Sequence, residues 1–184
     1  MKYYLGIDGG GTKTAYLLAD ETRKEIASIT RGGCSYREIG ISKVVKQFSE
    51  GIATITRMAG IEPGEVSCTA IGLPCYGEST KNDAILEEEI GKLFSGRKYV
   101  LANDVKVGWA GSLELRPGIN IVAGTGSIAY GENADGRSAR SGGWSSFFSD
   151  EGSCYWLGRR AMELFFKEAD GRTERGTLYP QMLA

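Results

Sequence analysis

The stretch that decides the fold is residues 2–19, KYYLGIDGGGTKTAYLLA. Apolar segments on either side of three consecutive glycines predict two strands joined by a tight turn. Glycine permits positive φ and lets a ligand approach the main chain, so the N–H groups of such a turn can bind an anion. The turn residues, to which we assign phosphate binding, are Asp8, Gly9, Gly10, Gly11, Thr12, Lys13 and Thr14.

Two better-known phosphate loops do not fit this stretch. Thr12 separates Gly11 from Lys13, so the G-x-x-x-x-G-K-[ST] pattern fails. The G-x-G-x-x-G dinucleotide pattern requires a helix where a strand is predicted here. Asp8 stands at the end of the first strand, where its carboxylate could hold Mg²⁺ through water. An ordinary glycine hairpin is the alternative interpretation of the same residues.

The amino-acid composition excludes several classes of partner and of catalytic chemistry. The 184 residues include 22 basic and 23 acidic side chains, 4 cysteines and no histidine. A balanced charge without a basic block argues against nucleic acid as a partner. The lack of histidine excludes Ser-His-Asp and Cys-His catalysis, so a carboxylate, Lys, Tyr or Cys must move any proton. With no secretion signal and no long apolar span, we expect a cytoplasmic protein with reduced thiols and no membrane partner.

Strands and helices alternate after the first hairpin. Apolar residues recur every three to four positions between 41 and 59, which predicts an amphipathic helix capped by Gly60. The remaining predicted elements are strands at 24–31, 66–72 and 98–102 and helices at 81–94 and from 103 to about 112. The segment Arg116-Pro117-Gly118 then interrupts the pattern.

A second strand–turn–strand unit follows that break. Strands are predicted at 119–123 and 128–131, and a helix from 150 to about 169. The turn between these strands, assigned to a second phosphate contact, consists of Gly124, Thr125, Gly126 and Ser127. We therefore predict an α/β protein with one domain at 1–115 and a second at 118–184. The second domain has too little helix to cover its strands, so we expect it to be truncated.

Asp104 lies where a buried strand ends and a helix begins, at the sheet edge that binds ligands in α/β folds. There it could accept the proton of an attacking hydroxyl as a general base. Aspartate is also a favoured N-cap residue, so its position alone leaves both roles open.

A second group of candidate residues lies between Gly142 and Ser153. It combines two adjacent glycines with Trp144 and the carboxylates of Asp150 and Glu151. Sugar sites use carboxylates for hydroxyl groups and an aromatic face for the ring. The two carboxylates could equally cap and charge the start of the following helix, with Trp144 in the core.

Taken together and in this order, the motifs resemble the BadF/BadG/BcrA/BcrD ATPase family, and within it the N-acetylglucosamine kinase branch. The resemblance is carried by Asp8–Thr14, Asn103-Asp104, Gly124–Ser127 and Gly142–Ser153, and it spans nearly the whole chain. The family belongs to the superfamily of actin, sugar kinases and heat-shock chaperone ATPases. The resemblance implies two ribonuclease-H-like α/β domains, with mixed sheets flanked by helices and with ATP and the sugar in the cleft between the domains.

The same resemblance assigns roles to individual residues. The two glycine turns bind the phosphates of ATP, Asp8 serves Mg²⁺ and Asp104 is the catalytic base. The residues implied to contact the sugar are Ser35, Cys75, Asp104, Gly142, Gly143 and Asp150.

The chain departs from the family's usual pattern in two respects. Ser35 stands where an Asn is usual, and Ser145 and Ser149 stand where glycines are usual, so the departures concern the sugar pocket. The adenosine-binding segment of the family is expected beyond Ala184, so the chain alone is expected to be inactive.

The activity that the resemblance implies is phosphorylation of the 6-hydroxyl of N-acetylglucosamine or glucosamine by ATP, in a homodimer by analogy. The alternative is an ATPase that activates a partner enzyme of the 2-hydroxyacyl-CoA dehydratase or benzoyl-CoA reductase type, with a cluster held by cysteines between two subunits. Such activators resemble the chain less at Asp104 and at 142–153, and they need no base for a hydroxyl. A sugar sensor without catalysis is a third interpretation, and the presence of both Asp8 and Asp104 counts against it.

Overall fold

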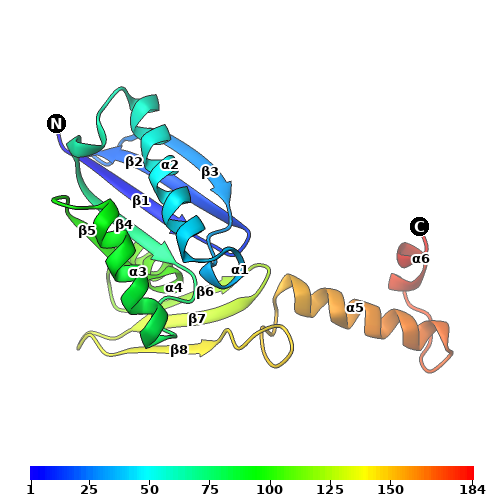
Figure 1. The fold of residues 1–184 in the computed structure, drawn as a ribbon. Helices are drawn as coiled ribbons and strands as arrows, with labels where there is room; N and C mark the ends of the chain where they lie inside the picture. Colours follow the sequence, from blue (N-terminus) through cyan, green and yellow to red (C-terminus); the bar gives the residue numbers. More distant parts are fainter. The chain divides into compact units, whose positions relative to one another are not determined.

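The hairpin predicted from residues 2–19 is present, and its first strand is the centre of a five-stranded sheet. The computed structural model describes all 184 residues, Met1–Ala184 (Figure 1). The strands of this sheet are β1 (Tyr3–Gly9), β2 (Lys13–Asp20), β3 (Glu25–Gly32), β4 (Val66–Leu73) and β5 (Tyr99–Asn103), in the order β3-β2-β1-β4-β5. Strand β2 is antiparallel to both β1 and β3, β4 is parallel to β1, and β5 is parallel to β4.

This topology places four strand ends at one edge of the sheet. Strands β1, β4 and β5 run in one direction, and β3 shares it because β2 reverses the chain between β1 and β3. The segments that follow these four strands therefore leave the sheet at the same edge. They begin at Gly10, Gly33, Pro74 and Asp104.

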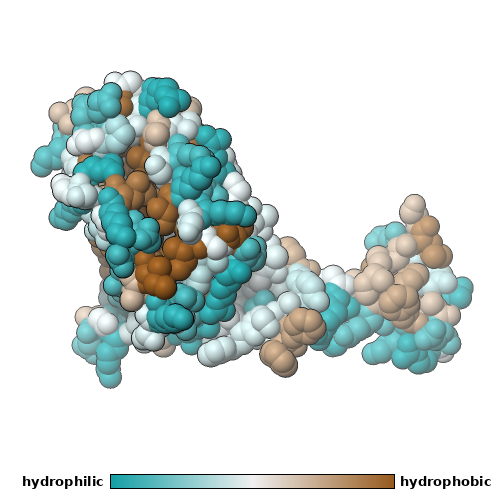
Figure 2. All heavy atoms as spheres, in the orientation of Figure 1, coloured by the Kyte–Doolittle hydropathy of each residue, from teal (hydrophilic) through white to brown (hydrophobic).

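Helices cover both faces of this sheet, as Figure 1 shows. They are α1 (Tyr36–Ile39), α2 (Ile41–Ala59), α3 (Thr80–Leu93) and α4 (Asp104–Leu113), with a 3₁₀ turn at Pro63–Glu65. The prediction of a helix over 41–59 is confirmed, and Gly60 caps it with a left-handed φ of 69°. In Figure 2 the outward surfaces of α2 and α3 are mostly hydrophilic, and apolar atoms lie between the two helices.

The core of this unit lies between the sheet and the pair α2–α3. Its fully buried members include Ile7, Leu18, Phe48, Ile71 and Leu86. Helix α4 packs on the opposite face of β4, where a side chain on Gly72 would lie 3.2 Å from both the Val107 Cβ and the Asp104 Cα. The glycine therefore lets the start of α4 approach the sheet closely.

Contacts divide the chain into the unit just described, Met1–Leu115, and a second unit, Arg116–Ala184. The second unit has a three-stranded antiparallel sheet and two helices. Its elements are β6 (Gly118–Ala123), β7 (Ser127–Glu132), β8 (Ser138–Gly142), α5 (Cys154–Ala169) and α6 (Leu178–Met182). The expected α/β class, with a mixed sheet flanked by helices, is confirmed. The assignment of two ribonuclease-H-like domains stays a prediction.

One prediction for the second unit was wrong, and one of its strands was missed. The helix predicted from 150 begins at Cys154, because Ser153 is its N-cap and accepts a hydrogen bond from the Trp156 N–H. Asp150 instead has a left-handed φ of 64°, which ends the preceding loop. Strand β8 was not predicted, because its sequence SARSG has no apolar alternation and pairing with β7 supplies its order.

The helices of the structure do not span a membrane: none combines the length and the apolar character that a bilayer crossing needs.

Candidate active site

The first glycine turn connects β1 to β2 and is closed by its own backbone. Gly10 N–H donates to the Lys13 carbonyl at 2.9 Å. A side chain on Gly11 would meet no atom within 4 Å, so the outer side of the turn is open to a ligand. Thr12 and Lys13 are also exposed there. The turn therefore has the room and the donors that a phosphate needs.

Thr14 has a different position from its neighbours in the turn. It is fully buried, and its hydroxyl donates to the Gly32 carbonyl at 2.8 Å. The sequence suggested that this hydroxyl is one of the donors to a phosphate. The structure instead makes it a support that holds the end of the turn against β3.

Asp8 and Asp104 come together at the carboxyl edge of the sheet. Asp8 pairs in register with Gly72 of β4, and the Cα of Asp104 lies over that same glycine. Burial raises the pKa of the Asp8 carboxyl, and the charge of Lys13 partly offsets the effect. Burial also raises the pKa of Asp104, and the nearby Asp8 carboxylate raises it further against the lowering effect of the Val105 N–H.

The structure separates the two interpretations of Asp104. The N-cap of α4 is Asn103, whose side-chain oxygen accepts from the Val105 N–H at 3.2 Å. Asp104 is the first helical residue, and its Oδ1 accepts from the same N–H at 3.0 Å. Because Asn103 caps the helix, Oδ2 of Asp104 is not needed for capping.

The loops beside Asp104 are joined to one another through main-chain carbonyls. The Asn103 amide donates to the Tyr76 carbonyl at 2.7 Å, and the Tyr36 hydroxyl donates to the Cys75 carbonyl at 3.3 Å. Cys75 has a left-handed φ of 63°, and burial together with Glu78 raises the pKa of its thiol. Ser35 is buried directly before α1. The structure thus brings Ser35, Cys75 and Asp104 to one edge.

The second glycine turn is held by the segment that leads into α5. Cys154 N–H donates to the Gly124 carbonyl at 2.8 Å, and the Ser127 hydroxyl donates to the Glu151 carbonyl at 2.8 Å. Asp150 is only 8% exposed, and a side chain on Gly126 would lie 3.0 Å from its Oδ2. The turn and the Asp150 carboxylate are therefore neighbours, and this carboxylate suits the hydroxyl groups of a sugar.

Gly142 and Gly143 both have positive φ, 79° and 71°. A side chain on Gly143 would lie 2.7 Å from Ile128 Cδ1, so the loop after β8 packs closely on β7. Trp144 is 68% exposed and stacks under the Arg140 guanidinium at 4.8 Å, so it is not a core residue of this unit.

The family model for the BadF/BadG/BcrA/BcrD ATPase family matches residues 5–184. The chain belongs to this family. An N-acetylmuramic acid/N-acetylglucosamine kinase of Clostridium acetobutylicum is 36% identical over 183 residues, which are 100% of the chain and 60% of that protein. An N-acetyl-D-glucosamine kinase of Dictyostelium discoideum is 30% identical over 175 residues, 91% of the chain and 55% of that protein.

Among solved structures, a protein of Chromobacterium violaceum assigned as an N-acetylglucosamine kinase superposes with a TM-score of 0.74 at 30% identity, covering 100% of the chain and 63% of that structure. The chain thus spans about 60% of the length of the relatives that it matches.

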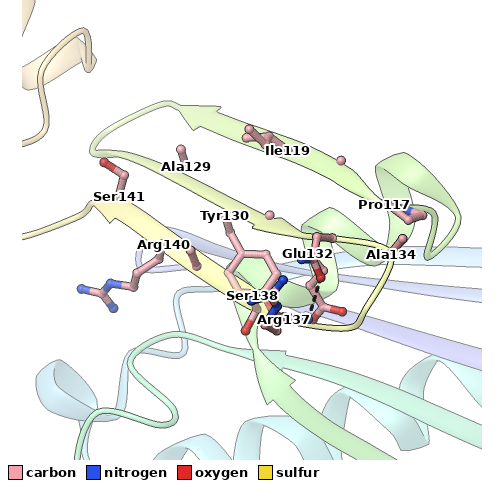
Figure 3. Close-up of a pocket in the computed structure, with 14 residues that line it drawn as sticks. Pro117, Ile119, Ala129, Tyr130, Glu132, Ala134, Arg137, Ser138, Arg140 and Ser141 are labelled. Carbon is pink, nitrogen blue, oxygen red and sulfur yellow. Dashed lines mark hydrogen bonds between the residues drawn. The ribbon is translucent and has the colours of Figure 1, made fainter.

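In this family member, two cavities lie on the second unit. The larger, of about 880 Å³, is lined by β6–β8 residues such as Ile119, Ala129 and Tyr130 and contains none of the predicted site residues (Figure 3). The smaller, of about 480 Å³, is lined by Ser127 and Gly142 of the predicted site. Of these two cavities, only the smaller is lined by residues of the predicted site, and both of those residues belong to the second unit.

Gln47 is a residue of the site region that the sequence did not reveal. Its amide lies on α2 and donates to the Gly32 carbonyl beside the first glycine turn. A single polar residue on an amphipathic helix has no motif, so only the tertiary structure shows its place.

Proposed function

We propose that the protein is an ATP-dependent sugar kinase that phosphorylates the 6-hydroxyl of N-acetylglucosamine or glucosamine. N-acetylmuramic acid is a further candidate, because the relative from C. acetobutylicum carries that sugar in its name. The observation that carries the proposal is the pair of carboxylates, Asp8 and Asp104, beside an open glycine turn at one sheet edge.

Asp104 is proposed as the general base. Its partial burial and the neighbouring Asp8 raise its pKa, which makes the ionised carboxylate a better proton acceptor near neutral pH. In the reaction the sugar hydroxyl gives its proton to Asp104 while its oxygen forms the new bond to phosphorus. The bond from phosphorus to the bridging oxygen of ATP breaks, and ADP leaves.

Asp8 is proposed as the contact for Mg²⁺. No group of three or more acidic or cysteine side chains in the chain could enclose a metal. A single carboxylate nevertheless suits Mg²⁺, which takes most of its ligands from water and nucleotide phosphates. When bound, Mg²⁺–ATP supplies the phosphoryl group and neutralises its charge, while the N–H groups of Gly11 and Thr12, at the open side of the turn, orient the phosphates.

The experiment is a measurement of ADP release by the full-length protein with Mg²⁺–ATP and a panel of amino sugars, hexoses and no sugar. We expect turnover that depends on an N-acetylated amino sugar, and a loss of kcat of roughly 10²–10⁴-fold in Asp104→Asn, since general-base catalysis contributes that much. Asp135→Asn, an exposed turn residue, is the control. Turnover that ignores both the sugar and Asp104 would refute the proposal, and iron content would then test the activator alternative.

We propose a cytoplasmic protein, and the state of its cysteines supports this setting. All four are unpaired in the structure, as in the reducing cytoplasm where we place the protein. We expect a homodimer by analogy, which light scattering on the purified protein measures.

A further inference from the structure

A single amide on α2 contacts both β2 and β3 beside the first glycine turn. Gln47 Nε2 donates to the Gly32 carbonyl at 2.7 Å and to the Thr14 hydroxyl oxygen at 3.1 Å. The Thr14 hydroxyl in turn donates to the same Gly32 carbonyl at 2.8 Å. The three groups form a closed triangle of hydrogen bonds around the end of β3.

Both partners of Gln47 lie directly beside the turn. Thr14 pairs in register with Gly9, the last residue of β1. Gly32 pairs with Lys13, the first residue of β2. Whatever moves these two residues therefore moves both ends of the turn.

The segment that follows β3, residues 33–34, contacts the turn directly. A side chain on Gly33 would lie 1.8 Å from the Gly11 carbonyl oxygen, so the two backbones are in direct contact. Cys34 N–H donates to the Gly10 carbonyl at 3.0 Å, and a side chain on Gly9 would collide with Cys34 Sγ at 2.4 Å. The segment 32–34 therefore contacts the turn and leads directly into Ser35.

These contacts matter because the turn cannot fix its own shape. Three glycines in succession leave it with more backbone freedom than any other sequence would. Phosphoryl transfer is sensitive to placement, and a misplacement of about 1 Å can lower a rate by about 10²-fold. The structure supports the turn from outside with two polar contacts, the Cys34 N–H bond to the Gly10 carbonyl and the triangle around Gly32.

We propose that Gln47 is a positioning residue of this kinase: through Thr14 and Gly32 its amide fixes the first glycine turn in the geometry that binds nucleotide phosphates. The inference rests on the proposed function, since it assumes that the turn binds a nucleotide. Gln47 itself touches no phosphate. It acts on binding through the carbonyl of Gly32, which the following residues transmit to Gly10 and Gly11.

The main test is Gln47→Met in the full-length protein, because methionine keeps the length of the side chain and removes the amide. The probe is Mg²⁺–ADP, whose Kd is measured by calorimetry, alongside the KM for ATP. We expect the Kd to rise at least about tenfold and the KM for the sugar to change less. The reason is that a misplaced phosphate turn weakens binding of the nucleotide more than binding of the sugar.

Thr56→Val is the matched control. Thr56 lies on the same helix, is 1% exposed, and donates its hydroxyl to the Ile52 carbonyl within α2. Like Gln47→Met, Thr56→Val removes a side-chain hydrogen bond from α2, and this bond is the more deeply buried of the two, but Thr56 has no hydrogen bond to the turn. A loss of stability alone lowers the active fraction in both variants and leaves the Kd of the folded molecules unchanged.

Thr14 gives an independent second variant pair. Thr14→Val keeps the shape and removes the hydroxyl, and we expect a rise in the Mg²⁺–ADP Kd like that of Gln47→Met. Thr14→Ser keeps the hydroxyl and should restore the wild-type Kd. The double variant of Gln47→Met and Thr14→Val should raise the Kd by much less than the product of the two single effects, because both break one triangle.

The outcomes separate the two proposals. If the wild-type protein binds no Mg²⁺–ADP, the proposed function itself is wrong and this inference falls with it. If the wild type binds Mg²⁺–ADP and phosphorylates a sugar, but Gln47→Met and Thr14→Val keep its Kd, the positioning role alone is refuted.

Discussion

Replacement of Gly33 by alanine tests whether the contact between β3 and the glycine turn is as close as the structure shows. Gly33 has no positive φ, so alanine meets no backbone strain there, and any effect comes from contact. The new methyl carbon would lie 1.8 Å from the Gly11 oxygen and 2.5 Å from the Gly11 carbonyl carbon. Cβ contacts shorter than 3.0 Å essentially do not occur, so the two backbones must separate by more than 1 Å.

Overpacking of this kind costs about 1–3 kcal/mol of stability, or roughly 2–12 °C in Tm for a chain of this size. The displaced turn should also bind Mg²⁺–ADP at least about tenfold more weakly, because phosphate contacts tolerate little misplacement. Urea unfolding and calorimetry measure the two effects.

The neighbouring variant Gly32→Ala is the control for this prediction. A side chain on Gly32 meets nothing within 4 Å, its φ is not positive either, and its carbonyl remains in place for Gln47. We expect it to be stable to within about 0.5 kcal/mol of the wild type and to bind Mg²⁺–ADP normally. Equal behaviour of Gly32→Ala and Gly33→Ala would show that the close approach does not exist and would refute the reasoning.

Three further predictions concern stability. Asp104→Asn should raise the urea midpoint at pH 7: the folded state raises the pKa of this carboxyl above 3.8, so the ionised form is destabilising above the raised pKa. The gain should disappear as the pH falls below 3.8, and an equal gain at both pH values would contradict it. Asn103→Ala should cost about 0.5–2 kcal/mol in urea unfolding because α4 loses its N-cap, and no loss would show that the cap is dispensable. Gly143→Ala should destabilise more than Gly136→Ala by about 1 kcal/mol or more: φ is positive at both, but only Gly143 lacks room, against Ile128. Hydrogen exchange in β7 and β8 compares the two, and equal protection would refute the difference.

The parts of the fold that the sequence predicted are those with local signals. The first hairpin is specified by three glycines between apolar strands, and the helix at 41–59 by an unbroken apolar stripe with a glycine cap. Strand β8 had no such signal, because its residues become ordered only by pairing with β7. The start of α5 was misplaced because an acidic residue, Asp150, stands where a cap is plausible, three residues before the actual cap Ser153.

The candidate site also has residues that local sequence signals predict and residues that only the tertiary structure reveals. Asp8 and Asp104 could be predicted because each stands at a strand end, and parallel strands bring such ends to one edge. The effect of Asp8 on the pKa of Asp104 could not be predicted, since it depends on the close approach of α4 over Gly72. The buried position of Thr14 and the role proposed for Gln47 depend on how α2 lies against β3, and residue spacing carries no information about that.

The bonds that join the loops at the sheet edge share one property. Gln47, Cys34, Tyr36 and Asn103 all donate to main-chain carbonyl oxygens. Every residue has a main-chain carbonyl, so substitution of the residue that accepts the bond leaves the acceptor in place. The hydrogen bonds that hold the loops can therefore persist when these side chains change. The side chain of Cys75, for which the family resemblance implies a sugar contact, could therefore be exchanged while the Tyr36 hydrogen bond to its carbonyl still holds the loop.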